Sequence, residues 1–79
     1  MYYVYILQSE KDASRYIGVT TDLRKRLQEH NLGRAKYSSA KRPYKILWYS
    51  AFLEKQRAYD FERYLKSSSG HAFTKKRLI

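Results

Sequence analysis

Five side chains in this 79-residue sequence are of types that could carry chemistry. Tyr5 and Tyr16 lie in two aromatic and aliphatic runs, Arg26 and His30 are four residues apart, and Glu62 lies in a later segment. Arginine binds phosphate through paired N–H groups, histidine carries protons near neutral pH, and a carboxylate binds hard divalent cations. Each of these residues could therefore take part in chemistry on a phosphate group, and each also has an ordinary structural interpretation.

Glu62 is the most informative of these residues. It lies four residues after Ala58 and three before Leu65, so in a helix it borders the apolar stripe. An unpaired carboxylate in that position is costly, and it requires a metal or an arginine such as Arg26 as its partner. Periodicity alone favours an ordinary ion pair.

Arg26 and His30 share one face of a predicted helix and can hold a phosphate beside a proton carrier. The alternative is a solvated face, since residues 24–26 form a run of cations, and spacing alone favours this alternative. Tyr5 and Tyr16 are more often packing residues than catalysts. A phenol with a pKa of about 10 becomes a base only if cations or a hydrogen-bonded histidine lower that value.

A hairpin is predicted to position the two tyrosines. If its turn is centred near residues 10–11, Tyr5 lies opposite Tyr16 on the same face of the sheet. Gly18 then lies opposite Tyr3, where the missing side chain permits a close approach. The predicted strands cover residues 2–7, 16–19 and 44–50, and the first is expected to be central because both of its faces are apolar.

Helices are predicted to supply the remaining residues. The first is capped by Thr20 or Thr21, buries Leu23 and Leu27, and stops at Gly33. The second covers residues 53–66 with an apolar face of Ala58, Phe61 and Leu65. Residues 67–70 are expected to interrupt it before a short basic helix over residues 71–79.

Composition limits the possible functions. The length allows one domain over residues 1–79, and the absence of cysteine excludes disulfides and thiolate metal sites. No apolar run approaches the roughly 18 residues that span a bilayer, and the N-terminal residues do not resemble a signal peptide, so a cytoplasmic setting is expected. A net charge of +10, spread along the chain, predicts a polyanion as partner, most commonly nucleic acid.

The five residues lie in an order that resembles the GIY-YIG nuclease family. Residues 3–5 and 16–18 are similar to its two signature segments, with Tyr5 and Tyr16 as the signature tyrosines. Arg26 matches the family's helical arginine, His30 follows four residues later, and Glu62 matches its metal-binding glutamate. The resemblance covers essentially the whole chain.

The resemblance implies an α+β fold of order β-β-α-β-α-α, with a three-stranded mixed or antiparallel sheet flanked by helices. It implies an endonuclease in which Glu62 holds one Mg²⁺ or Mn²⁺ ion and Arg26 binds the scissile phosphate. Tyr5, helped by His30, would activate the attacking water, and Tyr16 would orient water or phosphate. The nucleic acid, for which the resemblance favours DNA, would be held along its backbone by basic residues: Lys36, Lys41, Arg42, Lys75, Lys76 and Arg77.

Two departures from the family pattern stand out. Tyr3 occupies the position of a signature glycine, and the asparagine that many members carry after the glutamate helix is replaced by the segment SSSGHAF. The only asparagine is Asn31, so either Ser67–Ser69 or His71 takes that place or the activity is weak. A non-catalytic nucleic-acid-binding module explains the charge and the aromatic residues equally well, and a basic protein–protein adaptor explains the charge less well.

Overall fold

The computed structural model describes residues 1–33 and 39–78. Its elements follow the predicted order β-β-α-β-α-α, extended by two short helical turns. The bounds are β1 Tyr2–Ser9, β2 Arg15–Thr20, α1 Leu23–Asn31, η1 Ser39–Lys41, β3 Tyr44–Phe52, α2 Lys55–Lys66, α3 Ser68–Phe73 and η2 Thr74–Leu78.

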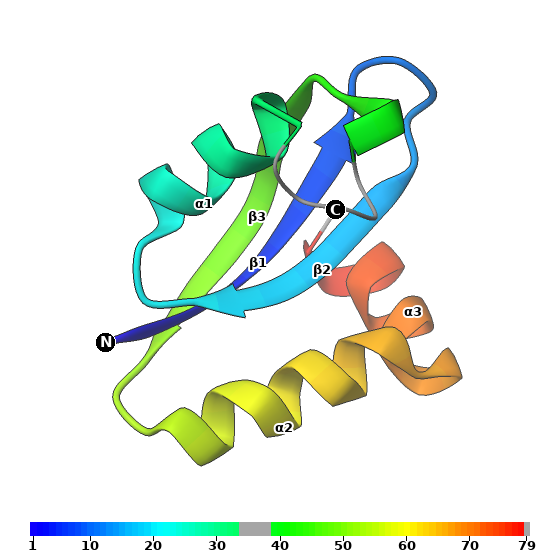
Figure 1. The fold of residues 1–79 in the computed structure, drawn as a ribbon. Helices are drawn as coiled ribbons and strands as arrows, with labels where there is room; N and C mark the ends of the chain where they lie inside the picture. Colours follow the sequence, from blue (N-terminus) through cyan, green and yellow to red (C-terminus); the bar gives the residue numbers. More distant parts are fainter. Residues whose placement is uncertain (34–38, 79) are drawn as a thin grey trace.

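The sheet is fully antiparallel, with strand order β2-β1-β3. The prediction that the first strand is central is confirmed, and its residues Val4–Leu7 are almost completely buried. Helix α1 covers one face of the sheet, while α2 and α3 cover the other (Figure 1). A central strand between two layers must be apolar on both faces, which explains the unbroken hydrophobic run in the sequence.

The predicted hairpin register is wrong by two residues. Tyr5 lies opposite Gly18, Leu7 lies opposite Tyr16, and Tyr3 lies opposite Thr20. The turn is therefore centred one residue later than predicted. Ser9 fixes this turn, because its hydroxyl accepts hydrogen bonds from the backbone N–H groups of residues 11 and 12. A shift of two residues keeps every side chain on its predicted face, so the hydrophobic pattern of the sequence fits both registers equally well.

The first helix begins later than predicted. Asp22 is its N-cap, and the Asp22 side chain accepts a hydrogen bond from the backbone N–H of Lys25. Thr20 instead exchanges hydrogen bonds with the backbone of Asp22 and shapes the preceding turn. Asp22 is as good a cap as threonine, so composition could not separate the candidates. Gly33, with φ of 78°, ends the helix as predicted.

The segment after α2 also differs from the prediction. Only Ser67 interrupts the helices, whereas residues 68–70 form the first turn of α3. The Ser67 hydroxyl accepts from the backbone N–H of Gly70 and donates to the carbonyl of Tyr64, so it closes both helix ends. Within the described residues, no helix is long and apolar enough to span a membrane.

Candidate active site

Gly18 makes room for Tyr5 at the edge of the sheet. A Cβ atom built on Gly18 would overlap the Tyr5 hydroxyl and lie 2.7 Å from its Cζ. The phenol of Tyr5 therefore lies across β2 and is only 1% exposed. The predicted close approach at Gly18 exists, but its partner is Tyr5 and not Tyr3.

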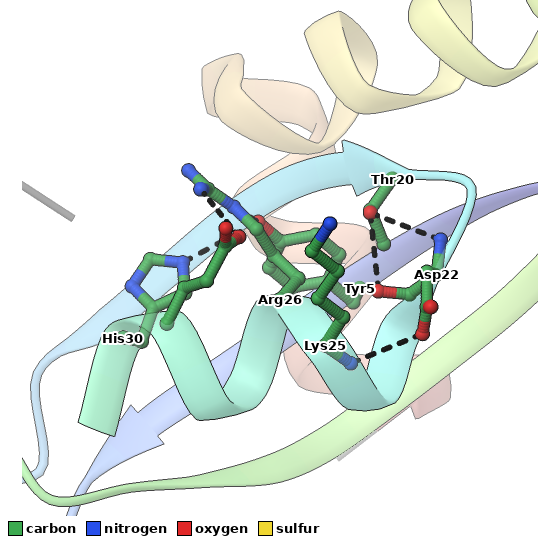
Figure 2. Close-up of polar contacts among 7 residues, drawn as sticks. Tyr5, Thr20, Asp22, Lys25, Arg26 and His30 are labelled. Carbon is green, nitrogen blue, oxygen red and sulfur yellow. Dashed lines mark hydrogen bonds and ion pairs between the residues drawn. The ribbon is translucent and has the colours of Figure 1, made fainter. Parts of the chain in front are cut away.

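The Tyr5 hydroxyl is the meeting point of two side chains from α1. Arg26 Nε donates a hydrogen bond to it at 3.3 Å, and His30 Nε2 lies 3.5 Å from it (Figure 2). Arg26 also forms an ion pair with Glu29 at 3.3 Å and keeps a third of its side chain exposed. The expectation of an ordinary solvated face is wrong for both Arg26 and His30, because α1 turns them onto the sheet.

Three tyrosine rings enclose His30, which is fully buried. The ring centroids of Tyr16, Tyr44 and Tyr5 lie 4.6, 5.6 and 6.3 Å from that of the imidazole, all in edge-to-face geometry. This geometry is the preferred one for aromatic pairs and fixes the orientation of the imidazole. Tyr16 also stacks on Tyr5 at 6.3 Å, so all four predicted residues on this face form one cluster.

The C-terminal end of α1 is attached to the sheet. At the C-terminal end, the side chain of Asn31 pairs with both backbone groups of Tyr44, accepting from N–H at 2.6 Å and donating to the carbonyl at 3.1 Å. The single asparagine of the sequence therefore joins α1 to the start of β3. At the N-terminal end, Asp22 caps the helix. His30 directly precedes the attachment at Asn31.

Burial sets the protonation states in this cluster. Burial raises the pKa of Tyr5, although the hydrogen bond from Arg26 acts in the opposite direction. Burial, followed by the positive charge of Arg26, lowers the pKa of His30 below its usual value of 6.5. The hydrogen bond to Tyr5 raises the pKa of Arg26 further above its usual range. At neutral pH the cluster therefore holds a neutral phenol, a neutral imidazole and a charged guanidinium.

Glu62 lies on α2, beyond the opposite face of the sheet. Its side chain is 16% exposed and borders the buried Ala58 and Leu65, as the helical periodicity predicted. Its partner is Lys66, with Nζ 3.0 Å from Oε2, and not Arg26. The Glu62 carboxylate is near enough to Tyr5 to contribute, as the smallest of several causes, to the raised pKa of the phenol.

The donor set at Glu62 suits one weakly held hard cation. No group of three or more histidine, cysteine, aspartate or glutamate side chains gathers in residues 1–33 and 39–78, which argues against a metal caged by protein ligands alone. Mg²⁺ usually keeps several waters and takes one or two carboxylates together with substrate phosphates. A single, partly covered carboxylate fits that pattern, and Glu62 is the residue that would hold the ion.

Three cavities of the described structure lie away from this cluster. None of these three is lined by Tyr5, Tyr16, Arg26, His30 or Glu62, and one of them, about 520 Å³, lies on the β3 side of α1.

The structure describes the side chains of four of the six predicted backbone-binding residues. Lys41 forms an ion pair with Asp12 at 3.2 Å beside the hairpin turn, and the Arg42 guanidinium packs against Gly33. Lys75 lines a cavity near β2, and Lys76 is exposed. Lys36 and the Arg77 side chain lie outside the described residues.

Several supporting residues were not identified from the sequence. The i, i+4 spacing of Glu62 and Lys66, and the i, i+3 spacing of Arg26 and Glu29, are local signals that could have found both pairs. The packing of Tyr44 on His30 has no local signal, because the two residues meet only when β3 packs against α1.

Comparisons with known proteins identify one family. The family model described as the GIY-YIG catalytic domain matches residues 1–77. A UPF0213 protein of Streptococcus pneumoniae is 45% identical over 65 residues, which cover 81% of this chain and 65% of that protein. This chain thus spans about two thirds of the length of that relative.

Further relatives agree with that match. A UPF0213 protein of Streptococcus agalactiae is 41% identical over 71 residues, covering 89% of this chain and 80% of that protein. The solution NMR structure of a UPF0213 protein from Bacillus halodurans is similar with a TM-score of 0.55 at 35% identity, covering 92% of this chain and 81% of the other.

Proposed function

This chain belongs to the GIY-YIG family of nucleases, and we propose that it is an endonuclease that hydrolyses phosphodiester bonds, with DNA as its substrate and one divalent metal ion as its cofactor. The observation that carries the proposal is the convergence of Arg26 and His30 on the Tyr5 hydroxyl beside Gly18. A purely nucleic-acid-binding module has no need of a buried imidazole hydrogen-bonded to a phenol.

Arg26 is the proposed phosphate ligand. One of its nitrogens is held by Tyr5 and another by Glu29, yet a third of the side chain remains exposed. The guanidinium is thus fixed in place and still able to donate to a phosphate oxygen. Such a donor acts most strongly where negative charge develops in the transition state, and it requires no reorganisation at that moment.

Tyr5 and His30 form the proposed proton relay. Because the pKa of His30 is lowered, its imidazole is neutral at pH 7 and can accept the phenol proton. Tyr5 can then take a proton from the attacking water. The raised pKa of Tyr5 keeps the relay in its resting state in the free protein. The hydrogen bond from Arg26 stabilises the phenolate when the relay operates.

Tyr16 and Glu62 complete the proposed site. Tyr16 packs against both Tyr5 and His30 and remains partly exposed, and we assign its hydroxyl the role of orienting water or phosphate. Glu62 would hold a Mg²⁺ or Mn²⁺ ion, which supplies charge stabilisation at the leaving oxygen. In the free protein, Lys66 neutralises the Glu62 carboxylate.

The test is a cleavage assay with labelled linear and branched DNA in Mg²⁺ or Mn²⁺, comparing the wild type with Glu62→Ala. We expect metal-dependent cleavage by the wild type only. Binding of DNA without cleavage under any of these conditions would favour the non-catalytic alternative and would overturn the enzyme proposal.

A further inference from the structure

Two neighbouring cavities lie where the β1–β2 hairpin meets the C-terminal helices. The larger, about 550 Å³, lies between the hairpin and the C-terminal turn, and Gln8, Arg15, His71 and Lys75 line it. The smaller, about 220 Å³, lies between β2 and the end of α2, and Lys66 is among its lining residues. Arg15 and His71 line both cavities, so the two form one groove, here called the Arg15 groove.

The walls of the Arg15 groove are held rigidly. A Cβ atom on Gly70 would overlap the backbone carbonyl of Tyr64 and lie 2.6 Å from the Cα of Leu65. The absence of a side chain at Gly70 therefore lets α3 pack directly on the end of α2. The buried Thr74 adds a hydrogen bond from its hydroxyl to the Gly70 carbonyl at 2.9 Å. These interactions fix His71, which lies one residue after Gly70, opposite the start of β2.

The hairpin side of the Arg15 groove is fixed as well. The Gln8 side-chain amide donates to the carbonyl of Ala13, which itself has a positive φ of 63°. This hydrogen bond braces the turn just before Arg15. The groove is therefore set between two braced segments that are far apart in the sequence.

The charged lining of the Arg15 groove is basic, and Ile6, Ile17, Leu65 and Thr74 complete the wall of the smaller cavity. Arg15, Lys66 and Lys75 are exposed cations, His71 adds an imidazole, and no acidic residue lines either cavity within the described part of the chain. Arginine and lysine bind phosphate as charge-assisted donors. A neutral imidazole still has one N–H to donate, so His71 can contribute in either protonation state. This combination suits a phosphate group.

The Arg15 groove is continuous with the proposed metal-binding residue. Lys66 lines the smaller cavity and also forms the 3.0 Å ion pair with Glu62, one helical turn earlier on α2. On the sheet side, Arg15 directly precedes Tyr16, so the same edge strand carries a groove residue and a site residue. A strand whose scissile phosphate lies at Arg26 and Glu62 can extend along β2 into the groove.

We propose that the Arg15 groove is a second phosphate-binding subsite that holds a neighbouring backbone phosphate of the cleaved strand through Arg15, His71 and Lys75. This inference rests on the proposed function for the identity of the strand. It assigns the groove a positioning role: it binds the substrate beside the cut and sets the register of the scissile phosphate at Arg26.

The experiment measures DNA affinity in EDTA by fluorescence anisotropy, so that no cleavage is needed. The groove variant is the double change Arg15→Gln and Lys75→Gln. Its matched control is Lys55→Gln with Arg57→Gln, which also removes one lysine and one arginine, both exposed and at the opposite end of α2. The groove variant should bind about ten-fold more weakly, and the control should stay within about two-fold of the wild type.

Salt dependence and a charge-conserving variant sharpen the result. In the groove variant, the negative log–log slope of affinity against salt concentration should become shallower by about 0.7–0.9, because one phosphate is no longer neutralised by the protein. The double change Arg15→Lys and Lys75→Arg should retain most of the affinity. Thermal melts should show all variants folded, because the substituted side chains are exposed.

A backbone substitution locates the phosphate. Oligonucleotides carrying one uncharged methylphosphonate at each position in turn should reveal a position where affinity falls for the wild type but not for the groove variant. Equal losses in both proteins at every position would overturn the proposal. Unchanged DNA affinity in the groove variant would also overturn the proposal. The groove would then be a candidate binding site for an acidic protein segment. Groove-dependent binding without any cleavage would instead refute the proposed enzyme while the subsite stands.

Discussion

The two faces of the sheet present their candidate site residues in different ways. Under α1, Tyr5 and His30 are buried and joined through a hydrogen-bonded cluster with Arg26. On α2, Glu62 borders the core but pairs with a half-exposed lysine. The cluster under α1 is already ordered in the free protein. Glu62, in contrast, is held by an ion pair with Lys66 that a divalent cation can replace. Rigid groups suit charge stabilisation and proton transfer, and an exchangeable carboxylate suits a metal that arrives with the substrate.

The largest expected effect concerns the α2 side. Glu62→Gln should reduce Mg²⁺-dependent cleavage by a factor of about 10³ or more, because the carboxylate is the proposed metal ligand. The melting temperature in EDTA should change little, since the substitution removes only a partly exposed ion pair with Lys66, typically worth about 0.3–0.5 kcal/mol.

The control for Glu62 is Asp60→Asn, which removes an exposed carboxylate that pairs with Arg63 on the same helix. It should leave cleavage unchanged. A large drop in melting temperature with retained cleavage in Glu62→Gln would make that residue structural and would remove the contrast between the two faces.

The next effect concerns the α1 side. Arg26→Ala should lower the rate of cleavage by about 10²–10³, as expected for a donor aimed at transition-state charge. DNA affinity in EDTA should stay within a few-fold, because many other cations can hold the backbone. Arg24→Ala, an exposed arginine on the same helix, should preserve the rate. If affinity and cleavage fell together by one factor, Arg26 would be an ordinary phosphate ligand.

Gly18→Ala should damage the α1 cluster through packing. The added Cβ would overlap Tyr5, so the ring must move, at a cost of about 1–3 kcal/mol in unfolding free energy. Urea denaturation measures the loss. In a Tyr5→Phe background the cost should be smaller, because the hydroxyl that would be overlapped is gone. Equal costs in both backgrounds would show that Tyr5 does not fill the space beside Gly18.

The smallest effect is a pH dependence that belongs to the α1 face alone. His30 has a lowered pKa in the folded protein, so below about pH 6.5 the unfolded chain binds a proton that the folded chain resists. This contribution to the unfolding free energy is present above about pH 6.5 and is lost as the pH falls toward the folded pKa. An NMR titration of the imidazole carbon-bound protons should place the midpoint for His30 below 6.5, whereas a midpoint above 6.5 would contradict the neutral relay.

The sequence predicted the elements of this fold well because their signals are local. The two-sided apolar run predicted the central strand, and helical periodicity placed Glu62 beside Ala58 and Leu65, which the structure confirms as buried. The errors lie where two local solutions have equal merit. Asp22 and Thr20 are both good N-caps, and a two-residue shift of the hairpin leaves every side chain on the same face.

By itself, then, the sequence determined the order of the elements, the faces of their side chains and the family resemblance that the family match supports. Only the tertiary structure decided which residues meet. His30 is enclosed by tyrosines from three strands, and Arg26, in a run of cations that indicated a solvated face, is turned onto Tyr5. These contacts depend on how α1 packs across the sheet. They join residues 21 and 25 positions apart, and the local sequence around each residue does not indicate that the two are close.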